Sequence, residues 1–223
     1  MSQSDLSYDD WIDYVFDHAV PSYGQAWYFD PDADWWDPRP ELAIAYLTRL
    51  FNDPGPLADQ FADGQIGQGL YYLVSSGASS HCVALTNEEV PLNERVSCIH
   101  AMLSLFINLF EPRCRPMLSH RDEASESELN RICYMWWDVM PLAALAKPSA
   151  PDPIHDACLG VMRSTLALQN PACQESALHG LGHWAHAYPE LAATTIDAYL
   201  AANQSLRPEL RGYAQAARSG CVN

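Results

Sequence analysis

The last fifty residues, 171–221, constrain the fold more than any other part of the chain. They contain three segments with helical periodicity, at 171–190, 189–204 and 207–220, and a proline stands near the start of each. Proline in the first turn of a helix removes no hydrogen bond, and its fixed φ suits a helix start. Asn170 and Ser205 are the predicted N-caps of the first and third segments. We therefore expect three consecutive helices here.

The first of these helices divides into an apolar and a polar face. The apolar side chains, which predict the core-facing side, are Ala177, Leu178, Leu181, Trp184, Ala185 and Tyr188. The opposite, polar side carries Glu175, His179, His183 and His186. Gly180 and Gly182 lie between the faces, and each costs about 1 kcal/mol relative to alanine. Close approach of another backbone would explain that cost, and Gly67 and Gly69 repeat the pattern in segment 63–76.

The segment ALHGLGHWAHAYPELAATTIDAYL, followed by RPELRGYAQAARSG, resembles HEAT-like helical repeats. In that class a helix of the type A-x-x-x-L-G precedes a P-E turn, and a later helix carries an arginine before small residues. Arg211, Ala214 and Ala217 occupy those later places here. The resemblance covers less than a quarter of the chain. It implies stacked helix pairs with a binding surface, and it implies no particular chemistry.

Helical periodicity continues through the rest of the chain, whereas no segment shows the sustained alternation of a strand. The further predicted helices are 5–18, 40–52, 53–61, 63–76, 91–110, 128–140 and 152–168. Cys98, Cys133 and Cys158 fall within these helices, where free thiols behave as small core residues. The predicted fold is all-α, either an irregular HEAT-like α-solenoid or a compact multi-helix domain.

A proline-rich stretch at 146–153 is the predicted boundary, if the chain has two domains. It would separate an N-terminal helical body, 1–146, from C-terminal HEAT-like helices at 152–223. The alternative is one continuous domain, which a chain of 223 residues can also form.

An acidic, aromatic stretch at 19–40 lacks helical periodicity and contains four prolines. Residues 1–40 hold nine aspartates and one arginine, which is half of the net charge of the whole chain. Aromatic residues at this density stay ordered only when they pack, so we expect a loop laid across the helices. Asp30, Asp32 and Asp34 have the spacing that opens a calcium loop. However, Pro31 follows the first aspartate and no glycine stands at the sixth position, so calcium is not expected.

Composition narrows the classes of partner and the compartment. A net charge of −16 argues against nucleic acid and anionic membranes as partners. It favours solubility and attraction to basic partners, and the alternative is that it only reflects a solvated surface. An odd number of cysteines does not suit a secreted disulfide framework. The N-terminus lacks the features of a signal peptide, and the longest apolar run, 101–110, is too short to span a bilayer. A cytoplasmic location is therefore expected.

The polar face of the 171–190 helix is the candidate for metal chemistry. His179 and His183 are four residues apart, and two such histidines can hold one zinc ion if a third ligand comes from elsewhere. Gly180 follows His179 where a zinc hydrolase would need glutamate. The pairs His155–Asp156 and His81–Cys82 are possible distant ligands. Cys98 and His100 are two apart on a helix and point in different directions, so no catalytic residue is assigned.

Two hypotheses of function follow. The first is a protein-binding helical-repeat protein without a cofactor, for example an inhibitor or immunity protein that masks a basic partner. The alternative is a metal-dependent enzyme that uses the His179, His183 and His186 face. The predicted binding residues are aromatic or charged, as interface centres and rims usually are, and they are Trp27, Tyr28, Trp35, Trp36, Asp37, Trp137, Asp138, Glu175, His179, His183 and His186.

Overall fold

The computed structural model describes residues 5–21, 25–123, 125–142, 150 and 152–222. Throughout these residues the regular structure is helical and no strand occurs, which confirms the predicted all-α class. None of the helices in the described part is long and apolar enough to cross a membrane.

The helices closely follow the predicted segments. The N-terminal half contains α1 Tyr8–Phe16, α2 Pro40–Asn52, α3 Gly55–Gln60, α4 Asp63–Val74 and α5 Leu92–Leu105, with α5 continuing through a π-helical turn, Phe106–Phe110, into α6 Glu111–Arg113. The C-terminal half contains α7 Glu128–Val139, α8 Pro153–Thr165, α9 Pro171–Trp184, α10 Pro189–Ala202 and α11 Pro208–Arg218. Short 3₁₀ turns occur at Trp27–Phe29, His81–Leu85 and Ser119–Arg121, and the first of them lies inside the stretch at 19–40 that was predicted as a loop.

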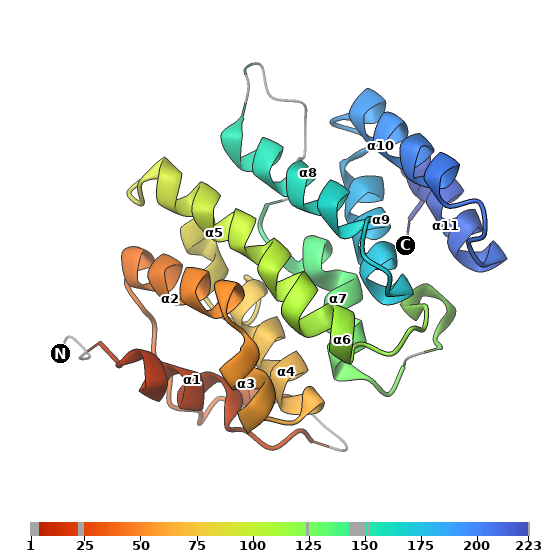
Figure 1. Ribbon diagram of the computed structural model, residues 1–223. Helices are drawn as coiled ribbons and strands as arrows, with labels where there is room; N and C mark the ends of the chain where they lie inside the picture. Colours follow the sequence, from red (N-terminus) through yellow and green to blue (C-terminus); the bar gives the residue numbers. More distant parts are fainter. Residues whose placement is uncertain (1–4, 22–24, 124, 143–149, 151, 223) are drawn as a thin grey trace.

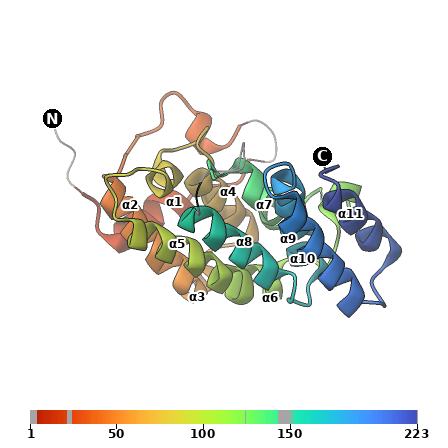
Figure 2. The same ribbon diagram turned by 90° about the horizontal axis from the view of Figure 1, so that it is seen from above.

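The main helices pack in two rows. In one row α2 contacts α5, and α5 contacts α8; in the other, α1, α4, α7, α9 and α11 contact one another in that order. Helix α8 joins the rows through α9, and α10 packs against α9 and α11. The elements succeed one another across the molecule in chain order (Figure 1), and the two rows are seen from above in Figure 2.

Contacts also cross the proline-rich stretch at 146–153, most of which lies outside the described residues. Helix α8 packs on α5, and α9 packs on α7. Buried side chains from both sides of the stretch belong to one hydrophobic cluster. The predicted division at this stretch therefore separates two sequence segments that share a core.

Side chains cap the N-terminal ends of several helices, and the N-cap predicted at Asn170 is confirmed. Ser7, Ser127, Asp152 and Asn170 each accept a backbone N–H at the start of α1, α7, α8 and α9 respectively. The prediction of Ser205 was wrong, because Arg207 is the N-cap of α11. Asp63 is the first residue of α4, and the N–H of the preceding Ala62 donates to the Gln65 side chain at 3.2 Å.

Glycines allow α7 to approach both of its neighbours in the same row. A Cβ at Gly67 in α4 would lie 2.7 Å from the carbonyl carbon of Glu128, and one at Gly180 in α9 would lie 2.7 Å from Cγ of Trp137. Gly182 meets the side chain of Val222 in a similar way. The predicted approach of another backbone thus occurs at Gly67, whereas at Gly180 and Gly182 the close neighbour is a side chain.

All seven cysteines are free thiols, and six of them are buried. The core positions predicted for Cys98, Cys133 and Cys158 are confirmed. Burial raises the pKa of the Cys98 thiol to about 12, which leaves it protonated at neutral pH. His100 is exposed, so these two side chains do not form a nucleophilic pair.

We predict that Gly67→Ala destabilises the fold, because the new methyl group would overlap the backbone of α7 at Glu128 and Leu129. The expected loss is about 1–3 kcal/mol in the free energy of unfolding, measured by urea denaturation. The matched control is Gly160→Ala in α8, where an added Cβ would have no atom of a neighbouring element within 4 Å. That change should be neutral or stabilise by up to about 1 kcal/mol. Equal effects of the two substitutions would contradict the packing argument.

Candidate functional site

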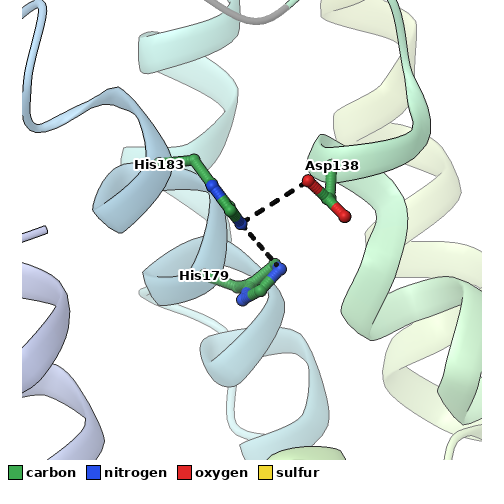
Figure 3. A group of neighbouring side chains, drawn as sticks. All are labelled: Asp138, His179 and His183. Carbon is green, nitrogen blue, oxygen red and sulfur yellow. Dashed lines mark hydrogen bonds and ion pairs between the residues drawn. The ribbon is translucent and has the colours of Figure 1, made fainter. Parts of the chain in front are cut away.

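Asp138 joins the two histidines of α9 in one cluster. His179 and His183 lie on successive turns of α9, and Asp138 is the penultimate residue of α7, which packs against α9. The His183 Nε2 atom lies 3.1 Å from His179 Nε2 and 3.6 Å from Asp138 Oδ1 (Figure 3). One potential ligand atom from each side chain lies within 4.8 Å of the other two. Asp138 is thus a possible third ligand, whose identity the sequence alone did not indicate.

The cluster is buried on one side and open on the other. His179 is 1% exposed, and burial, followed by the nearby His183, lowers its pKa to about 3. Its imidazole is therefore neutral at physiological pH. The side chains of His183 and Asp138 are 35% and 40% exposed. A ligand could thus reach the cluster from the side of His183 and Asp138.

A tyrosine from α11 fixes the orientation of His179. The Tyr213 hydroxyl oxygen lies 2.7 Å from His179 Nδ1 and 3.1 Å from the Tyr134 hydroxyl oxygen. The ring of His120 stacks on Tyr213 at a centroid distance of 4.2 Å. Burial raises the pKa of Tyr134 and that of Tyr213, so both hydroxyls keep their protons at neutral pH. His179 is therefore held in place on the side away from His183.

Glu175 lies one turn before His179 and is fully buried. Its carboxylate accepts the backbone N–H groups of Ser119 and His120 at 2.8 and 3.0 Å, and it contacts His120 Nδ1 at 2.5 Å. Burial raises the pKa of Glu175, while these donors favour its charged form. Glu175 thus anchors the 119–121 turn beside Tyr213.

The predicted polar face of α9 is not a continuous exposed surface, which corrects the expectation from helical periodicity. Glu175 and His179 are buried because α11 and the 119–121 turn cover them. Helix α9 ends at Trp184, so His186 lies in the following turn, where it is exposed. His183 alone of the four is on the helix and partly exposed.

A groove of about 750 Å³ lies next to this cluster, between α4, α7, residues 25–29 and the side chains of Ser119, Asp122 and Ser125. Its apolar lining is formed by Phe29, Tyr71, Ile132, Met135 and Val139. Tyr134 also lines the groove, and its ring lies 4.3 Å from that of His179. Tyr134 therefore lies between the groove and the Asp138–His179–His183 cluster.

The aromatic stretch lies over α1 and α4, and only some of its predicted contact residues reach the surface. Trp27 is half-buried and stacks on His18, while Tyr28 and Trp36 are buried in the core. Trp35 is 48% exposed, and Asp37 is exposed and accepts a hydrogen bond from the Ser80 hydroxyl.

Phe29 was not among the predicted contacts, but it is 46% exposed and lines the groove. It belongs to the short turn Trp27–Phe29, which has too few residues for a periodic pattern to indicate which side chain points outward. Trp137, one of the predicted binding residues, is 2% exposed because it packs against Gly180.

The other candidate ligands lie apart from the cluster. His155 Nδ1 contacts the Tyr188 hydroxyl at 2.8 Å, and His81 accepts a hydrogen bond from Trp11 Nε1 at 3.0 Å. Asp30 accepts the backbone N–H of Asp32 in a local turn. Among the described residues, Asp138, His179 and His183 are the one group of three potential metal ligands.

Comparisons with known proteins give no relatives. No protein-family model matches the chain, and neither curated proteins nor solved structures match it. The resemblance of residues 171–221 to HEAT-like repeats therefore stays a prediction.

We predict that the buried histidine His81 makes the free energy of unfolding fall in acid. Burial lowers its pKa to about 3, and protonation at Nε2 would also break the bond from Trp11. Since the unfolded chain binds this proton near pH 6.5, its contribution to stability falls as the pH drops from about 6.5 toward 3. The expected slope from this group is about 1.4 kcal/mol per pH unit.

Urea denaturation between pH 7 and pH 4.5 measures this effect. His81→Gln should show a shallower loss of unfolding free energy than the unmodified chain, because glutamine can accept the Trp11 N–H without titrating. His100→Gln removes an exposed histidine and is the control. If His81→Gln and the unmodified chain lose stability in parallel, the buried neutral histidine is not the cause.

Proposed function

We propose that this protein binds a basic protein partner through the groove between α4, α7 and residues 25–29. The observation that carries the proposal is the apolar lining of the groove next to the exposed ring of Phe29. Aromatic and methionine side chains in a concave surface are typical of interface centres, where few residues supply most of the binding energy. This position suits one apolar side chain of a partner inserted between Phe29 and Met135.

Charge around the groove supports a basic partner. Asp30, Asp32 and Asp34 are exposed immediately after Phe29, and Asp122 lies in the groove lining. Arg131 is the cation in the lining, and it pairs with Glu128. With a net charge of −16 on the chain, the field favours approach of a positively charged surface. The partner segment is therefore an apolar residue flanked by lysine or arginine.

An inhibitor or immunity protein is one concrete form of this proposal. Masking a basic toxin or nuclease requires an acidic surface that excludes its substrate, and the charge of this chain suits that role. The second candidate function is a metal-dependent enzyme, which is favoured by the position of Asp138 beside His179 and His183. That candidate depends first on whether the cluster binds an ion.

The partner can be captured from the groove itself. A photo-crosslinking amino acid placed at Phe29 or Met135 should trap a basic protein from the source cells. The same residue at Ile107, which is 45% exposed but outside the groove, should not trap it. Identical cross-linked proteins from the groove and the Ile107 position would contradict the proposed interface.

Binding to the captured partner should depend on salt and on the groove. The association rate constant, measured by surface plasmon resonance, should fall steeply between 25 and 150 mM salt, because long-range attraction is screened. Met135→Glu should weaken binding at least tenfold through faster dissociation, whereas Ile107→Ser should leave it unchanged. An association rate indifferent to salt would exclude the electrostatic part of the proposal.

A further inference from the structure

The geometry points to a binding site for one divalent transition-metal ion, zinc or ferrous iron, formed by Asp138, His179 and His183. This inference is independent of partner binding through the groove. It rests on the convergence of two ring nitrogens and one carboxylate oxygen from two packed helices.

The distances between the donor atoms suit one ion. In a tetrahedral zinc site with ligand bonds of about 2.0–2.2 Å, two donor atoms are about 3.4 Å apart. The two Nε2 atoms are 3.1 Å apart, and Asp138 Oδ1 lies 3.6 Å from His183 Nε2. One potential ligand atom from each of the three side chains lies within 4.8 Å of the other two. The Asp138 side chain is 40% exposed, so its carboxylate has room to turn toward the histidines.

The chemistry of the donors selects the class of ion. Imidazole nitrogen suits zinc, iron, copper and nickel, whereas magnesium and calcium prefer sites made of oxygen. Two histidines with one carboxylate form the ligand set of many zinc sites and of non-haem ferrous sites. Three protein ligands leave at least one coordination position, which water can reach from the exposed side of His183 and Asp138.

Tyr213 is a positioning residue for this site. A metal-ligating histidine usually donates its second ring N–H to a fixed acceptor, which sets the tautomer and the ring orientation. The Tyr213 oxygen, 2.7 Å from His179 Nδ1, is that acceptor. The tautomer with its proton on Nδ1 directs the Nε2 lone pair of His179 toward His183 and Asp138.

Isothermal titration calorimetry with zinc chloride and the full chain, without a histidine tag, tests the site. One zinc ion per chain should bind saturably, and magnesium chloride should give no comparable binding. His183→Ala and Asp138→Asn should each weaken zinc binding at least tenfold. The matched control is His186→Ala, since His186 is an exposed histidine three residues after His183 and outside the cluster. It should leave the dissociation constant unchanged.

Tyr213→Phe separates positioning from ligation. It keeps the aromatic ring that stacks on His120 but removes the oxygen that orients His179. Zinc affinity should fall about tenfold, as for other outer-shell partners. Circular dichroism of each metal-free variant confirms that it is folded. Zinc should also raise the melting temperature of the unmodified chain and of His186→Ala, but not that of His183→Ala.

Three outcomes would overturn the inference. The first is the absence of saturable zinc binding to the unmodified, folded chain. The second is zinc binding that survives both His183→Ala and Asp138→Asn, which would identify other surface groups as the ligands. The third is an equal loss of affinity in His186→Ala and His183→Ala.

Discussion

The packing of α7 between α4 and α9 is the constraint on which the candidate sites depend. On one side the backbone of Glu128 lies against Gly67, and on the other the indole of Trp137 lies against Gly180. Neither contact has room for a Cβ atom. Helix α7 also carries Met135 in the groove and Asp138 in the cluster, so these close contacts determine where both side chains stand.

Polar and aromatic side chains connect the groove to the Asp138–His179–His183 cluster. Tyr134 faces the groove, contacts the ring of His179 and approaches the hydroxyl of Tyr213. Behind it, the buried carboxylate of Glu175 anchors the turn that contributes Ser119 to the groove. A molecule bound in the groove would therefore touch residues that also hold His179 in place. Such shared residues are the physical requirement for one ligand to affect the binding of another.

The features that could be predicted from the sequence are those that depend on local periodicity. The all-α class, most helix starts and the adjacency of His179 and His183 follow from spacing and capping residues alone. The sequence could not predict Asp138 as their neighbour, because the contact between His183 and Asp138 joins residues 45 positions apart through the packing of two helices. Periodicity likewise identified the face that carries Glu175 but not the turn that buries it. The polar character of a helix face does not show whether the face is exposed to solvent or is buried with its polar groups hydrogen-bonded inside the protein.

The distribution of thiols has a practical consequence for spectroscopy. Cys221 is the one exposed cysteine of the seven, all of which lie in the described part of the chain. It follows Gly220, where an added Cβ would lie 3.5 Å from the carbonyl oxygen of Gly182 and 3.6 Å from Cβ of Ala185, at the end of α9. A maleimide dye or nitroxide would therefore attach at a single position close to His183 without further mutagenesis. The native chain thus provides its own reporter for events at that end of α9.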